Sequence, residues 1–84
     1  MTDRDHPLRL CVLSPHGTLL DTAAKSVRLT AVDGSIGIHR GHPTALILLA
    51  HGKLSYMKNG AWAELDTNGV FAEVRDDTVT VIAE

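Results

Sequence analysis

The chain has 84 residues, 44% of them hydrophobic, and a formal net charge of -2, which allows one compact soluble domain and disfavours a protein that binds the phosphates of nucleic acid. Cys11 is the only cysteine, so an internal disulfide is excluded, and residues 1–7 lack the apolar stretch of a signal peptide. The longest apolar run, residues 44–50, is too short to span a bilayer, so we expect membrane association only through a protein partner.

The first half of the chain predicts two half-buried strands. Over residues 8–13 every second residue is apolar, and the sequence SPHG at residues 14–17 ends that strand. Residues 25–32 alternate in the same way and end at the turn signal of residues 33–34. We expect residues 1–7 to form a flexible segment ahead of a single domain.

The middle of the chain predicts a strand and then a hairpin. The leucine- and isoleucine-rich run at residues 45–50 fits a buried strand or a helical turn, and its β-rich neighbours favour the strand. Residues 53–58 and 61–66 flank Asn59-Gly60, the pair that best tolerates positive φ at both centres of a type I′ turn.

The last part of the chain predicts a second hairpin. Residues 70–75 and 78–83 alternate apolar with polar residues on either side of the turn signal Asp76-Asp77, with Val70, Ala72 and Val74 on one face of the first strand. Many short strands and no long amphipathic helix indicate an all-β protein. The expected architecture is a small antiparallel β-sandwich, or flattened barrel.

The histidines and glycines of residues 34–42 give weak signals for chemistry. His39 and His42 could offer two nitrogens to a metal ion, but no nearby acid or cysteine completes the set and Arg40 between them disfavours a cation. The glycine spacing fits neither the dinucleotide fingerprint nor the phosphate-binding loop. We instead expect residues 34–44 to form a long, shaped loop that serves as a contact surface.

No residue is assigned a catalytic, cofactor-binding or metal-binding role. Cys11 lies within a strand pattern, where a half-buried small hydrophobe is more common than a nucleophile, and no serine has a nucleophile-elbow sequence. Two alternatives stay open: a stand-alone sandwich that binds a ligand or metal through its histidines, and a small hydrolase.

Two aromatic residues are candidate anchors for a partner. Alternation places Trp62 on the polar face with Glu64 and Asp66, and it groups Phe71 with Glu73 and Arg75. A large aromatic on a polar face either covers an edge of the sandwich or anchors a binding partner. The sequence favours neither choice.

The order of the turns and loops resembles the N-terminal domain of the F-type ATP synthase epsilon subunit. The likeness is carried by VLSPHG at residues 12–17, VRL at 27–29, GSIGIHRGH at 34–42, and NGVFAEV at 68–74 followed by VTVIA at 79–83. The glycine-histidine segment at 34–42 is the most specific of these. Ser35 replaces the family's usual glutamate and Arg40 its usual proline, which adds positive charge and implies a partner surface with compensating negative charge.

The resemblance implies a non-catalytic rotor subunit that binds the gamma subunit and rests on the ring of c subunits, in a complex that moves protons or sodium ions. It implies a peripheral location on the cytoplasmic face of a bacterial plasma membrane, with no cofactor. The family's helical hairpin would follow Glu84, so we expect a short form that couples the rotor without restraining ATP hydrolysis. The residues expected at the gamma and c-ring interface are Gly34, Ser35, Gly37, His39, Arg40, Gly41, His42, Thr44, Ser14, Trp62 and Phe71.

Overall fold

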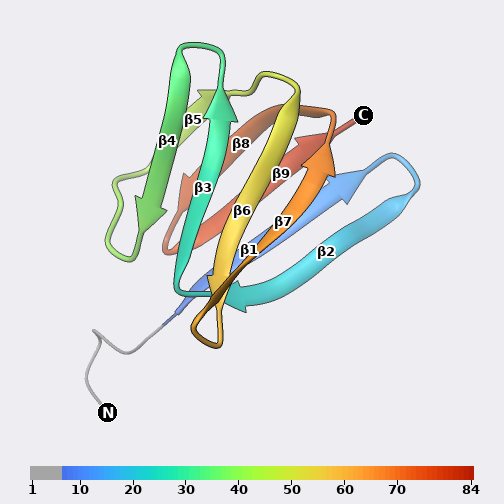
Figure 1. Cartoon of the computed structure of the whole chain (residues 1–84). Helices are drawn as coiled ribbons and strands as arrows, with labels where there is room; N and C mark the ends of the chain where they lie inside the picture. The colour runs from blue at the N-terminus through green and yellow to red at the C-terminus, as the bar shows by residue number, and fades with distance from the viewer. Residues whose placement is uncertain (1–6) are drawn as a thin grey trace.

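The computed structural model describes residues 7–84, and all regular secondary structure in that range is β-strand (Figure 1). The flexible segment expected over residues 1–7 falls outside the described residues except for Pro7, which is exposed. The strands are β1 (Leu8–Ser14), β2 (Gly17–Ala24), β3 (Ser26–Ala31), β4 (Gly34–His39), β5 (Ala45–Leu48), β6 (Gly52–Lys58), β7 (Ala61–Thr67), β8 (Gly69–Arg75) and β9 (Thr78–Ala83).

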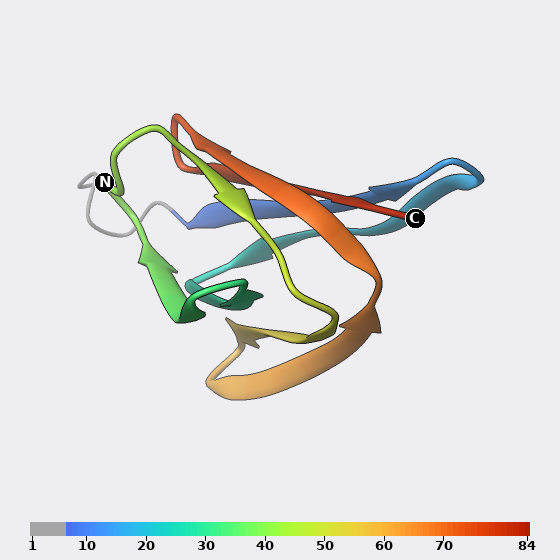
Figure 2. The same ribbon diagram turned by 90° about the horizontal axis from the view of Figure 1, so that it is seen from above.

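The strands form two sheets that face each other (Figure 2). One sheet has the order β2-β1-β9-β8-β5 and the other the order β4-β3-β6-β7. This confirms the predicted all-β sandwich. Every pair of neighbouring strands is antiparallel except β1 and β9, which run parallel.

The sheets are joined at two corners, which gives the sandwich the character of a flattened barrel. At one corner the N–H of Lys25, between β2 and β3, donates a 2.8 Å hydrogen bond to the carbonyl of Met57 on β6. At the other corner the segment after β5 bonds both sheets, because the N–H of Leu49 bonds the carbonyl of Val70 and the N–H of Ala50 bonds that of Thr30.

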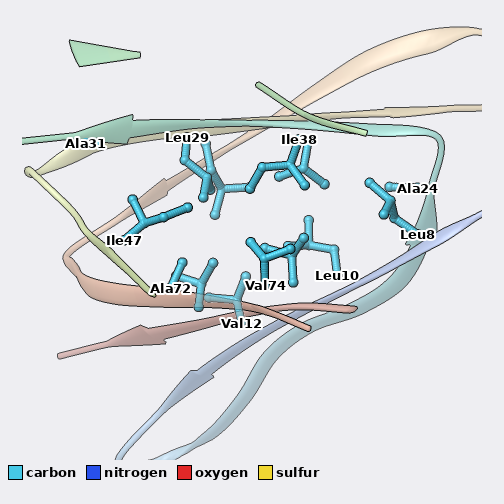
Figure 3. Packing of buried hydrophobic residues seen from close by; sticks show 14 of the residues in the cluster. Leu8, Leu10, Val12, Ala24, Leu29, Ala31, Ile38, Ile47, Ala72 and Val74 are labelled. Atoms are coloured by element: carbon cyan, nitrogen blue, oxygen red, sulfur yellow. The ribbon is translucent and has the colours of Figure 1, made fainter. Parts of the chain in front are cut away.

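The core lies between the sheets and is built by alternation (Figure 3). The three apolar residues that the sequence placed on one face of β1 are at most 1% exposed, and no polar or charged side chain is buried among residues 7–84. The run at residues 45–50 is a strand over its first four residues, as predicted. The buried residues are Leu8, Leu10, Val12, Ala24, Val27, Leu29, Ala31, Ile38, Ile47, Leu54, Ala72, Val74, Val79, Val81 and Ala83.

Two edge strands were not predicted. β2 carries an irregularity opposite Val12 and Leu13, and most of its side chains are exposed, so its sequence has no clear apolar period. β4 occupies residues 34–39, so the long loop expected over residues 34–44 is wrong for its first six residues. Glycine at two of those six positions weakened the alternation that marks a strand.

The tight turns follow the predicted chemistry, with one irregularity that the sequence did not reveal. Asn59 and Gly60 have φ of 53° and 77°, as the type I′ turn requires, and Asp76 and Asp77 share positive φ at 49° and 57°. A register shift near the start of β8 exposes Val70, which was expected on the same face as Ala72 and Val74.

Candidate partner interface

The expected contact residues of the 34–44 segment are spread along β4 and the turn that follows it. β4 carries the chain from the β3–β4 turn to the β4–β5 turn (Figure 1). Ser35 and His39 are therefore separated along the strand by about 13 Å at the usual rise per residue. The extra positive charge expected from the changes at Ser35 and Arg40 is not one continuous patch, because Ser35 lies near the start of β4 and Arg40 follows its end.

The turn after β4 is anchored to the β8–β9 turn. The N–H of Gly41, whose φ is 84°, donates a 2.7 Å hydrogen bond to Oδ1 of Asp77. The N–H of His42 bonds the carbonyl of His39 at 3.1 Å, and Nδ1 of His42 donates to the carbonyl of Pro43 at 2.7 Å. These bonds hold residues 39–43 in one conformation and leave Gly41 and Thr44 exposed.

At the other end of β4, a groove opens between the β3–β4 turn and β5. Its volume is about 520 Å³, and its lining comes from residues 31–36 and 46–48. Val32, Leu46 and Leu48 are 65%, 69% and 61% exposed, so three large apolar side chains border the groove beside the polar Asp33 and Ser35. Gly34 and Ser35 belong to this groove, and Gly37 lies farther along the same edge.

An apolar row crosses the outer face of the five-stranded sheet. Strand register places Leu48 beside Phe71, Phe71 beside Ile82, and Ile82 beside Leu13. Their chain neighbours Ile47, Ala72, Val81 and Val12 lie in the core, so these four side chains face outward. We call the set Leu13, Leu48, Phe71 and Ile82 the apolar row.

The sequence pointed to only one member of the apolar row, Phe71. The signal for Leu48 was present, because alternation through residues 45–48 exposes every second side chain, but the run was treated as buried throughout. The alignment of four strands into one row depends on strand order, which alternation within a strand does not reveal.

Ser14 and Trp62 lie apart from these surfaces. The hydroxyl of Ser14 donates to the carbonyl of Gly17 at 3.1 Å and accepts from the N–H of His16 at 3.2 Å, so it closes the β1–β2 turn. Trp62 lies on the outer face of the four-stranded sheet, as alternation predicted, and the guanidinium of Arg28 lies 5.1 Å from its ring centroid.

Cys11 is half-buried on β1, and its Sγ lies 3.6 Å from Oδ1 of Asp21. Arg9 bonds the same carboxylate at 2.8 Å. A side-chain hydrogen bond to Cys11, and to a lesser extent one to Asp21, raises the pKa of the exposed Arg9 guanidinium.

Within residues 7–84 no three His, Cys, Asp or Glu side chains come together as metal ligands. That stretch also contains no helix that could cross a membrane.

Residues 7–84 match the family model described as the β-sandwich domain of the ATP synthase delta/epsilon chain. The ATP synthase epsilon chain of Prochlorococcus marinus strain MIT 9303 is 40% identical over 75 residues, which are 89% of this chain and 56% of that protein. The epsilon chain of Symbiobacterium thermophilum is 33% identical over 78 residues, or 92% of this chain and 56% of that protein. The chain thus spans little more than half the length of these curated relatives.

Two solved structures share the fold. One belongs to the central stalk and c-ring of the mitochondrial ATP synthase of Tetrahymena thermophila, with a TM-score of 0.74, 15% identity, and coverage of 93% of this chain and 63% of that one. The other belongs to the mitochondrial ATP synthase of Euglena gracilis, with a TM-score of 0.80, 21% identity, and coverage of 99% and 55%. Identities this low establish the common fold only.

Proposed function

Because this chain belongs to the ATP synthase delta/epsilon-chain family through its β-sandwich domain, we propose that it is a non-catalytic central-stalk subunit of an F-type ATP synthase. In that role it joins the gamma subunit to the ring of c subunits and moves with them as the rotor turns. The observation that carries the proposal is the family match, which runs through every strand of the described residues.

The rigidity of the fold suits a part that transmits torque. The two sheets are joined at both corners by backbone hydrogen bonds, and the core between them is wholly apolar among the described residues. A close-packed interior deforms little under load, so force applied to one face reaches the other. This role requires fixed interfaces and no reactive group.

The apolar row is the surface that best fits the gamma subunit. Leu48 is 61% exposed, and its neighbour Phe71 is half-buried, so together they offer an anchor of the kind that dominates protein interfaces. Leu46, which is 69% exposed beside Glu73 on the same face, extends the surface toward the sheet edge. Phe71 is thus retained from the contact residues predicted by sequence.

The two ends of β4 supply separate contacts in this proposal. The turn at residues 39–44 lies at one end of β4, and the groove at Gly34 and Ser35 lies at the other. In this proposal one of the two surfaces contacts gamma and the other contacts the c-ring. The complex would place the protein at the membrane as a peripheral subunit, on the cytoplasmic face in a bacterium. Ser14 and Trp62 are weaker contact candidates, because each already has a partner within the chain.

Reconstitution tests the proposal. The tagged chain is mixed with the gamma subunit and then with detergent-solubilised c-ring, both from the organism that encodes this chain. The complexes are separated by size-exclusion chromatography. We expect a stable complex with gamma, and capture of the c-ring only when both proteins are present. Failure of the wild-type chain to bind gamma would overturn the stalk role. Metal retained in stoichiometric amount after dialysis, and lost in His42→Ala, would favour the ligand-binding alternative.

A further inference from the structure

β4 differs from the other sheet edges because nothing in its sequence blocks the addition of another strand. Proteins usually protect exposed edges with lysine or other charges, proline, bulges or short strands. β7 carries Glu64 and Asp66, β2 has an irregular register, and β5 has only four residues. β4 has six residues, GSIGIH, with no lysine, arginine, aspartate or glutamate, no proline and no register shift against β3.

The hydrogen bonds of β3 establish which of its backbone groups point toward β4. The N–H of Val32 bonds the carbonyl of Leu48, and the carbonyl of Thr30 accepts from the N–H of Ala50. Thr30 and Val32 therefore direct their backbone groups away from β4, and Ala31 between them directs its own toward β4. Backbone direction alternates along an antiparallel strand, so the same holds for every second residue of β3.

The open backbone groups of β4 follow from this alternation. Leu29 is in register with Ile36, so this pair exchanges the hydrogen bonds between the two strands. The alternate residues Ser35, Gly37 and His39 point their N–H groups away from β3, and β4 is the last strand of its sheet. Among residues 7–84, these three N–H groups thus form an open hydrogen-bonding edge.

The apolar groove lies beside the start of this edge. A strand added there would direct every second side chain inward, where Ile36 and Ile47 line the groove. A helix satisfies its own backbone groups and would leave the edge unused. A second copy of this chain, pairing through its own β4, has no side chain to offer the groove, because its Ile38 is fully buried in its own core and its Ile36 packs against that core.

The charged residues on either side of β4 indicate which sequence an added strand should have. Asp33 immediately precedes β4, and Arg40 immediately follows it. An extended segment with apolar residues at alternate positions, a basic residue near Asp33 and an acidic residue near Arg40 is complementary to both ends. The groove also shares Leu48 with the apolar row, so one partner can reach both surfaces.

We infer that the β4 edge is a strand-addition site, at which an extended segment of the partner protein pairs with Ser35, Gly37 and His39 and fills the adjacent groove. The inference rests on the proposed function for the identity of that partner, the gamma subunit. It assigns the edge-strand residues a role that is carried by backbone groups, so a substitution at Gly37 that keeps the backbone N–H should leave binding intact.

Two measurements on the full chain test the inference. The first is amide hydrogen exchange by NMR with and without gamma, in which we expect the N–H groups of Ser35, Gly37 and His39 to slow by tenfold or more. The second is the variant Gly37→Pro, which removes one outward donor without removing a bond to β3. We expect its affinity for gamma to fall by roughly tenfold, the effect of one interfacial hydrogen bond.

Gly37→Ala is the matched control, because it keeps the N–H and its added Cβ meets only Cε1 of His39 at 3.7 Å. Its affinity should equal that of the wild type. If gamma binds and the three amides exchange as before, strand addition is overturned while the stalk role stands. If the three amides slow without gamma, and do so more at higher concentrations of this chain, two copies pair through β4. That outcome also overturns strand addition by gamma. If wild-type gamma binding is absent, both proposals fail.

Discussion

The backbone N–H of Gly41 donates a 2.7 Å hydrogen bond to Oδ1 of Asp77. The two residues lie in different turns, one between β4 and β5 and the other between β8 and β9. Both have positive φ, at 84° and 57°. The carbonyl of Asp77 also accepts a 3.0 Å hydrogen bond from the N–H of Arg9 at the start of β1. One residue therefore links the β4–β5 turn to the neighbouring strands.

Removal of the Asp77 carboxylate should loosen the β4–β5 turn. Asp77→Gly accepts the positive φ but has no acceptor, so we expect the free energy of unfolding to fall by about 1 kcal/mol and the Gly41 amide to exchange faster. Asp77→Asn keeps an acceptor oxygen and tolerates the same backbone angle, so it serves as the control. Unchanged exchange at Gly41 in Asp77→Gly would contradict this role. Hydrogen exchange by NMR measures the effect.

Charge reversal at Arg40 should weaken attachment to the rotor without unfolding the domain. If the turn faces a negatively charged partner, Arg40→Glu replaces attraction with repulsion, and the loss should be largest at low ionic strength. Titration calorimetry against the gamma and c-ring complex at several salt concentrations gives the affinity. Lys53→Glu, on the outer face of the four-stranded sheet, is the matched reversal. Equal binding by Arg40→Glu and the wild type would remove this turn from the interface.

A charge placed in the apolar row should weaken binding of gamma. Leu48→Glu puts a carboxylate beside Phe71, and we expect the affinity for gamma to fall by more than about tenfold while stability changes by less than about 0.5 kcal/mol. Leu19→Glu changes a leucine of similar exposure, 54% against 61%, on the edge strand β2. The row is not the gamma surface if the two variants bind equally well.

Truncation of a core leucine should lower the free energy of unfolding far more than truncation of an exposed one. Leu10 is fully buried, so Leu10→Ala should lower the free energy of unfolding by about 3 kcal/mol, a large part of the total for a domain of this size. Leu46→Ala removes the same atoms at 69% exposure and should cost less than about 0.5 kcal/mol. Urea unfolding followed by tryptophan fluorescence measures both. Similar losses in the two variants would contradict the assignment of faces.

The parts of the fold that the sequence predicted correctly depend on neighbours in the chain. Alternation placed Leu8, Leu10 and Val12 in the core, because the two faces of a strand meet different environments. Asn59-Gly60 marked its hairpin because few residues accept positive φ at both centres of a tight turn. These signals act over two to four residues, so they can be found in one sequence.

The features that the sequence did not reveal depend on contacts between distant segments. β4 is a strand because β3 pairs with it, although glycine weakens its own pattern, and Val70 is exposed because β8 shifts register against β9. A local pattern cannot specify either event, since both depend on the partner strand.

The sequence by itself thus determined the sandwich, core-facing residues such as Leu8, Leu10 and Val12, and, through the glycine-histidine segment, a family resemblance. Only the tertiary structure decided that the ends of β4 lie apart, that Phe71 lies between Leu48 and Ile82, and that β4 is the last strand of its sheet. The physical reason is that a surface is made by register and strand order. Those are set when the whole core packs at once, between residues far apart in the chain.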